Sequence, residues 1–186
     1  MPNNPPPPAH QRPVISICGS SVSDPAVEAV AEELGRLIVQ AGWVLACGGR
    51  GGVMEAASRG GQRARVDGAQ GLVLGILPGS DRTEANPYLD LVIPTGIGYA
   101  RNSVVVLAAD VVMLVCGSTG TLSEAAYAWH YGKPVIALPG QAAGPGAWQV
   151  RPWTTAARTR SSRPRIRLRP WSSRARRWAR GADHGR

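Results

Sequence analysis

The sequence lacks the features that would place it in several common protein classes. Its most apolar region, Val104–Val115, is too short to span a membrane and is interrupted by Asp110. The first residues, MPNNPPPPAHQRP, contain no apolar core of the kind that a secretory signal needs. These absences predict a cytoplasmic protein with no membrane partner.

Cysteine is also scarce. The three cysteines, Cys18, Cys47 and Cys116, are odd in number and widely spaced, which excludes a disulfide framework and a zinc pattern. All three fall at the ends of expected strands. They are therefore interpreted as small buried residues in a reducing compartment, with a thiol at a ligand site as the alternative. No metal site is predicted.

Two common nucleotide-binding motifs are missing. The turn after the first expected strand reads GSSVSD where a dinucleotide-binding enzyme has a three-glycine fingerprint, so an ordinary NAD enzyme is not expected. No GKS or GKT phosphate loop occurs anywhere in the chain, which argues against ATP hydrolysis of that type.

The net charge of +9 belongs to the end of the chain. Residues 151–186 contain 12 of the 21 basic residues and one of the 12 acidic ones, so residues 1–150 carry 9 basic and 11 acidic side chains. The sequence thus predicts a disordered proline-rich N-terminus at 1–13, one domain at 14–146, and a basic, disordered tail at 147–186. The tail is interpreted either as a nucleic-acid-binding arm or as the product of a shifted reading frame.

Strand and helix patterns alternate through the domain. Short apolar runs without polar alternation predict strands that are buried on both faces, and amphipathic segments predict the helices between them. The fold class is therefore a Rossmann-like α/β domain, a doubly wound parallel sheet of about six strands with helices on both faces. The expected strands are Val14–Cys18, Trp43–Cys47, Gly71–Leu77, Leu89–Ile93, Val111–Val115 and Pro134–Leu138, and the expected helices run from Asp24-Pro25 to Gln40, over Val53–Arg65, over Gly98–Ala109 and over Thr121–Tyr131.

Glycine-rich turns follow several of these strands. In parallel α/β sheets, ligands bind beyond the carboxyl ends of the strands, where exposed backbone N–H groups hold anions such as phosphate. The clustered turns predict a phosphate or nucleotide site, and Thr95-Gly96 forms a further turn at the same edge. The predicted binding residues are Gly19, Ser20, Ser21, Gly48, Gly49, Gly51, Gly52, Met54, Gly117, Ser118, Thr119, Gly120 and Thr121.

The stretch from Gly98 to Glu124 combines such a turn with two charged side chains. Arg101 lies in the first turn of an expected helix, where a cation opposes the helix dipole unless an anion is held nearby. Glu124 lies about one turn into the helix that follows the glycine turn. Simpler interpretations remain open: Thr121 and Glu124 fit a capping box, Arg101 can pair with a surface acid, and the glycine and serine turns can be purely structural.

The segments GGRGGVMEAASRG, GYARN and CGSTGTLSE resemble the Lonely Guy and molybdenum-cofactor-carrier superfamily of Rossmann-like proteins, whose distant relatives include DNA-processing protein A. The resemblance covers about Val14–Gly146. Against the superfamily signature PGGxGTxxE, this chain keeps Gly117, Gly120, Thr121 and Glu124 and has Cys116 and Ser118 in place of a proline and a glycine. Of the arginine-lysine pair, Arg101 is kept and Asn102 replaces the lysine.

Lonely Guy enzymes cleave the N-glycosidic bond of nucleoside 5′-monophosphates. The resemblance therefore implies a hydrolase with Arg101 and Glu124 as catalytic residues, no required cofactor, and a homodimer. Glu124 would stabilise the oxocarbenium-like state, and Arg101 would bind phosphate or assist the leaving base. The first alternative is a non-catalytic carrier or sensor of molybdenum cofactor or another nucleotide. The second is nucleic-acid binding, with the tail as the contact.

Overall fold

The computed structural model describes residues 12–138, so the predictions for residues 1–11 and 139–186 lie outside the described part of the chain. Within it the predicted Rossmann-like fold is confirmed: all five strand pairs of the sheet are parallel, in the order β4-β3-β2-β1-β5-β6. The strands are β1 (Val14–Gly19), β2 (Val44–Cys47), β3 (Leu72–Leu77), β4 (Leu91–Pro94), β5 (Val111–Val115) and β6 (Val135–Leu138).

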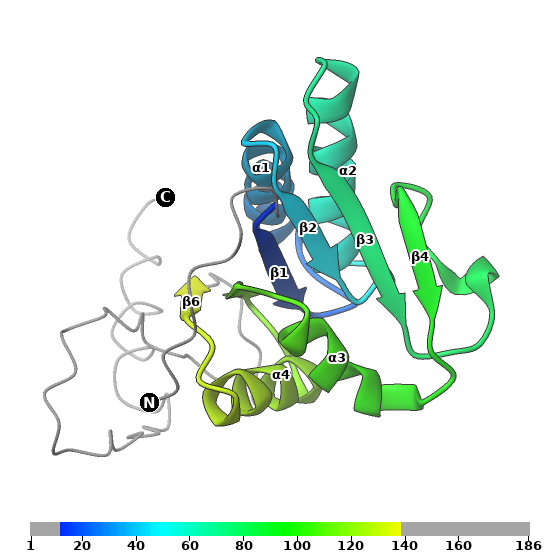
Figure 1. Cartoon of the computed structure of the whole chain (residues 1–186), viewed down its shortest axis with the longest axis vertical. Helices are drawn as coiled ribbons and strands as arrows, with labels where there is room; N and C mark the ends of the chain where they lie inside the picture. Colours follow the sequence, from blue (N-terminus) through cyan, green and yellow to red (C-terminus); the bar gives the residue numbers. More distant parts are fainter. Residues whose placement is uncertain (1–11, 139–186) are drawn as a thin grey trace, which may run out of the picture. The chain divides into compact units, whose positions relative to one another are not determined.

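Four helices among residues 12–138 cover the sheet. The helices α1 (Pro25–Gln40) and α2 (Val53–Val66) lie on one face, and α3 (Arg101–Leu107) and α4 (Thr119–His130) lie on the other (Figure 1). Each pair buries its own apolar cluster against the sheet. Ile17, Leu45 and Val73 belong to the cluster below α1 and α2, and Val105, Val112 and Ala128 belong to the cluster below α3 and α4. No helix among residues 12–138 is long and apolar enough to cross a membrane.

The strand order reverses between β1 and β5, which are neighbours in the sheet. Their register pairs Gly19 with Val115, so the turns after the two strands begin side by side at the carboxyl edge. Such a switch point leaves a gap between the two crossover connections, and ligands of open α/β sheets bind there. The fold thus brings the GSS and CGSTGT turns together from segments almost 100 residues apart in the sequence.

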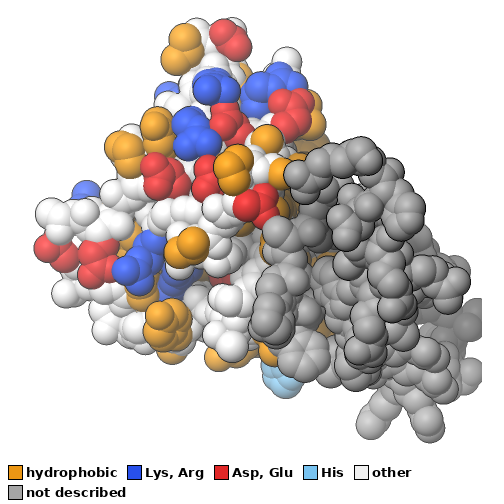
Figure 2. Space-filling view, turned by 180° about the vertical axis from the view of Figure 1, so that it is seen from behind, with side chains coloured by type: hydrophobic (Ala, Val, Ile, Leu, Met, Phe, Trp, Pro, Cys, Tyr) orange, Lys and Arg blue, Asp and Glu red, His pale blue; other side chains and the backbone are white. Residues whose placement is uncertain are grey.

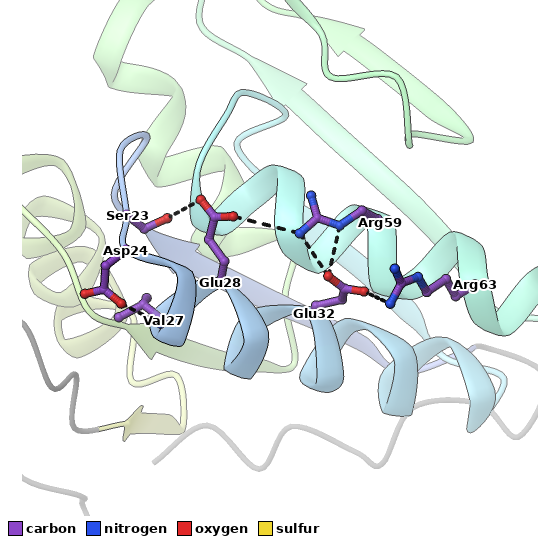
Figure 3. A network of polar contacts seen from close by, with 7 residues as sticks. All are labelled: Ser23, Asp24, Val27, Glu28, Glu32, Arg59 and Arg63. Atoms are coloured by element: carbon purple, nitrogen blue, oxygen red, sulfur yellow. Dashed lines mark hydrogen bonds and ion pairs between the residues drawn. The ribbon is translucent and has the colours of Figure 1, made fainter.

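Helices α1 and α2 pack so closely that glycines of each helix lie against the backbone of the other. A Cβ at Gly35 would stand 1.9 Å from the carbonyl oxygen of Ala57, and one at Gly60 would stand 1.8 Å from that of Glu32. Ion pairs lie along the same contact: Arg59 and Arg63 of α2 both reach Glu32 of α1 (Figure 3). This packing fixes α2 and therefore the glycine-rich turn that precedes it.

Two element boundaries differ from the sequence prediction near the site. The helix expected over Gly98–Ala109 is a 3₁₀ turn at Gly98–Ala100 followed by the seven residues of α3. The last helix begins at Thr119, with Ser118 as its N-cap, and not at Thr121. Thr121 is therefore no N-cap residue, and the alternative in which Thr121 and Glu124 form a capping box is wrong.

The close contact between α1 and α2 makes Gly60 sensitive to a single methyl group. We expect Gly60→Ala to lower the free energy of unfolding by about 3 kcal/mol, because its Cβ meets backbone atoms that cannot rotate away. Gly120→Ala is the matched control, since Gly120 is also helical and has no atom within 4 Å of the added carbon. Urea denaturation of the two variants measures the difference; equal stability would contradict this account of the helix contact.

Candidate anion-binding site at the sheet switch point

Among the helices that begin at the carboxyl edge, α1, α2 and α4 differ in how their N-termini are satisfied. An α-helix begins with N–H groups that lack intrahelical partners, and these attract negative charge. In α1 the chain supplies that charge itself: the Asp24 carboxylate accepts the N–H of Val27 at 2.9 Å, and Glu28 follows in the first turn. In α2 the Val53 N–H donates to the carbonyl of Ser20, and Glu55 lies in the first turn. Neither helix therefore offers the best position for an external anion.

At the N-terminus of α4, no capping side chain accepts an N–H and no acidic side chain in the first turn supplies negative charge. Its N-cap residue, Ser118, makes no side-chain hydrogen bond to the helix, and its first turn contains no acidic residue. The Thr121 hydroxyl is buried and has no hydrogen-bond partner within the described residues. A buried hydroxyl without a partner costs free energy, so these free donors indicate a place for an anionic ligand.

Backbone strain precedes this helix. Cys116 has a φ of 46°, in the left-handed region that residues other than glycine rarely adopt, at a cost of about 1–2 kcal/mol. Proline, which the superfamily signature has at this position, cannot adopt a positive φ. The turn into α4 therefore follows a backbone path of its own, and such strained residues concentrate at ligand sites.

Asn102 holds the start of α4 in place. Its side-chain amide donates to the Ser123 hydroxyl at 2.8 Å and reaches the Gly120 carbonyl at 3.4 Å, while Ser123 itself donates to Gly120 at 2.6 Å. The sequence analysis noted Asn102 only as a replaced lysine. The structure shows it as a positioning residue, engaged with the protein and not free to meet a ligand.

Arg101 is buried beside the turn after β2. Its side chain is only 5% exposed, and its guanidinium lies against Gly48, where a Cβ would stand 2.1 Å from Nη1. Its Nε and Nη1 atoms have no hydrogen-bond partner within the described residues, and no ion pair joins it to a carboxylate there. The alternative in which Arg101 pairs with a surface acid is therefore wrong. Burial lowers the pKa of Arg101, an effect that the charge of Glu124 opposes.

Glu124 is the acidic group of the site and is 6% exposed. Burial raises its pKa to about 7, although the positive charge of Arg101 and a hydrogen bond from the Cys18 thiol act in the opposite direction. Burial also raises the pKa of Cys18, helped by the negative charge of Glu124. At neutral pH the site thus contains a carboxyl group divided between its charged and neutral forms.

The remaining predicted binding residues take different positions. Gly19 begins the turn after β1, and the Ser20 hydroxyl accepts the N–H of Val22, so Ser20 at least stabilises its own turn. Met54 is buried in α2, which favours a packing role. Thr95-Gly96 follows β4, the outer strand of the sheet and three strands away from β1, so this turn does not join the switch point.

Asn86 is a residue that the sequence analysis missed. Its backbone N–H donates to the Gly49 carbonyl at 2.9 Å, and its side chain donates to the Arg50 carbonyl at 3.1 Å. It thereby fixes the glycine turn after β2 from a loop 36 residues further along the chain. No local pattern around Asn86 marks this long-range contact.

Comparison with known proteins shows the family to which the chain belongs. A model of the SLOG cluster4 family matches residues 12–163, which extends past the end predicted at Gly146. The chain belongs to the SLOG cluster4 family. An uncharacterized protein of Archaeoglobus fulgidus is 40% identical over 124 residues, covering 67% of this chain and 78% of that protein. The predicted membership of the Lonely Guy and molybdenum-cofactor-carrier superfamily is thus confirmed.

Solved structures similar to this chain include two proteins that are named for the molybdenum cofactor. The molybdenum cofactor binding protein of Rippkaea orientalis is 41% identical with a TM-score of 0.64, over 69% of this chain and 77% of that one. The molybdenum cofactor carrier protein of Chlamydomonas reinhardtii is 34% identical with a TM-score of 0.61, over 68% and 76%. DNA processing protein A from Helicobacter pylori, at 22% identity and a TM-score of 0.56 over 69% and 66%, shares the fold.

The raised pKa of Glu124 predicts a pH dependence of stability. Its folded pKa of about 7 exceeds the usual value near 4.3, so the folded state binds the proton more tightly than the unfolded state. The stability that the neutral carboxyl provides is complete below about pH 4 and is lost as the pH rises towards 7. We expect Glu124→Gln to be more stable than the native chain at pH 8, by up to about 3 kcal/mol, and equal to it at pH 4.

Urea denaturation at pH 4, 6 and 8 measures this difference. A constant gap between the two proteins across the range would show that Glu124 titrates normally. Thr119→Ser serves as a control, because it changes the same helix without touching a titrating group.

Proposed function

We propose that this chain is a binding protein that carries a phosphorylated ligand of the molybdenum cofactor type. The observation that carries the proposal is the N-terminus of α4, which has no capping side chain, a buried Thr121 hydroxyl without a partner, and no acidic residue in its first turn. The cofactor bears a phosphate group, and phosphate is the anion that a free helix N-terminus accommodates best. The similarity to a molybdenum cofactor binding protein and to a molybdenum cofactor carrier protein supports this choice of cargo.

The donor set fits the phosphate end of such a cargo and not a metal site. No group of three or more His, Cys, Asp or Glu residues that could hold a metal ion occurs within residues 12–138. The described part of the chain therefore offers backbone N–H groups, a hydroxyl and a guanidinium, which are donors for oxyanions. The protein would hold its cargo through the organic part.

Hydrolysis of a nucleoside 5′-monophosphate is the second candidate, and the closeness of Arg101 and Glu124 favours it. An oxocarbenium-like state needs an ionised carboxylate beside it. Burial keeps Glu124 partly neutral near pH 7, and Asn102 stands at the lysine position with its amide engaged by α4. These two features favour carriage over catalysis.

Nucleic-acid binding is the weakest of the three candidates for the described part of the chain. On the face seen in Figure 2, basic and acidic side chains alternate, whereas a nucleic-acid surface is dominated by basic ones. The tail at 147–186 and the homodimer expected from the resemblance both stay predictions. Light scattering during size-exclusion chromatography would measure the mass of the particle and so show whether the chain forms a dimer.

Carriage can be tested on the cofactor itself. The full chain is expressed in cells that synthesise molybdenum cofactor, and the bound pterin is released by denaturation and measured by its fluorescence. We expect Thr121→Val to carry about fivefold less pterin than the native chain, because it keeps the side-chain shape but removes one hydrogen bond. Ser103→Ala on α3 is the control and should carry the native amount. Equal loading of Thr121→Val and the native chain would overturn the proposed phosphate site.

Glu124→Gln separates the carrier from the hydrolase. A carrier should retain its pterin in this variant, since the ligand is held by donors and not by the carboxylate. A hydrolase incubated with AMP, or with an N6-substituted AMP, should release free base and should lose this activity with Glu124→Gln. Base release by the native chain that disappears in the variant would establish the hydrolase in place of the carrier.

A further inference from the structure

The turn Gly48–Gly52 after β2 presents a second group of free donors. The backbone N–H groups of residues 50–52 donate no hydrogen bond within the described part of the chain. The carbonyls of Gly49 and Arg50, by contrast, are both bonded to Asn86. With its acceptors engaged and its donors free, this turn resembles the backbone concavities that bind oxyanions. Gly49 and Gly52 both have positive φ angles, 74° and 63°, and left-handed residues are a feature of such anion-binding turns.

Arg101 adds side-chain donors to the same turn. Its guanidinium lies directly against Gly48, and its Nε and Nη1 atoms are buried without a partner. Because a buried, unpaired guanidinium N–H is costly, an acceptor from outside the described residues is expected at this point. Glu124 is near enough to influence Arg101 electrostatically but forms no ion pair with it.

A second arginine lies in the turn itself. Arg50 is exposed. Burial is the main cause that lowers the pKa of Arg101, and the charges of Glu124 and the cysteines oppose it. The positive charge of Arg50 lowers the pKa of Arg101 further. Two neighbouring guanidinium groups repel each other unless an anion lies between them. The Glu55 carboxylate is a competing negative charge, 3.6 Å from where a Cβ on Gly51 would stand.

The turn Gly48–Gly52 itself is separate from the N-terminus of α4. The turn Gly48–Gly52 follows β2 and the turn into α4 follows β5, and these two strands flank β1 on opposite sides. Two strand spacings place the turns roughly 10 Å apart. We propose that the site has two anion-binding positions, and that its ligands are small molecules with a phosphate at one end and a second oxyanion group at the other. This inference rests on the proposed function, which assigns the phosphate to α4.

The experiment compares two sugars that differ by one phosphate. Fructose 6-phosphate and fructose 1,6-bisphosphate are titrated into the full chain by calorimetry. We expect the bisphosphate to bind about tenfold more tightly, because it alone can occupy both positions. Arg50→Gln should remove this difference while leaving the monophosphate affinity unchanged. Arg36→Gln, which alters a partly exposed arginine of α1, is the matched control and should keep the full ratio.

The outcomes separate the two proposals. Equal affinity of both sugars for the native chain, or a ratio that survives Arg50→Gln, would overturn the second position. Thr121→Val should weaken both sugars; if it weakens neither, the phosphate position at α4 is wrong, whatever Arg50 does. Glu55→Gln should strengthen only the bisphosphate, since it removes the competing carboxylate near the turn.

Discussion

The site depends on the imbalance between helix N-termini at one edge of the sheet. A helix dipole directs partial positive charge towards its start, and the free N–H groups there need an acceptor. Asp24 provides one for α1, at the position where a conventional dinucleotide-binding protein holds pyrophosphate. At α4 the chain provides none, although Thr121 and the first turn are positioned by Asn102. The phosphate site that we propose therefore lies at α4, on the other side of the switch point from the first crossover.

Packing far from the ligand maintains this arrangement. The contact between α1 and α2 at Gly35 and Gly60 fixes the direction of α2, and Asn86 fixes the turn Gly48–Gly52. The guanidinium of Arg101 can then lie against Gly48 without forming an ion pair with a carboxylate among the described residues. A substitution at Gly35, Gly60 or Asn86 would displace the N–H donors of the proposed site without removing a group that contacts the ligand.

Most of the architecture was predictable from the sequence, because apolar runs and glycine turns are local signals. The parallel sheet and the gathering of the GSS, GGRGG and CGSTGT turns at one edge follow from strand order alone. The contacts of single side chains did not follow. The position of Arg101 over Gly48 and the bond from Asn86 to Arg50 join residues more than 30 positions apart, and no periodicity encodes them. The sequence analysis placed the start of α4 at Thr121, two residues after Thr119, where the helix begins.

The central claim is that an anion binds at the start of α4 and not at the start of α1. The most direct measurement is a titration of ¹⁵N-labelled chain with fructose 6-phosphate, followed by the amide resonances. The account predicts that the amides of Gly120 and Thr121 move downfield as they donate to phosphate, while the amide of Val27, already bonded to Asp24, stays in place. Movement of the Val27 amide with Gly120 and Thr121 unchanged would place the anion at α1 and contradict the account.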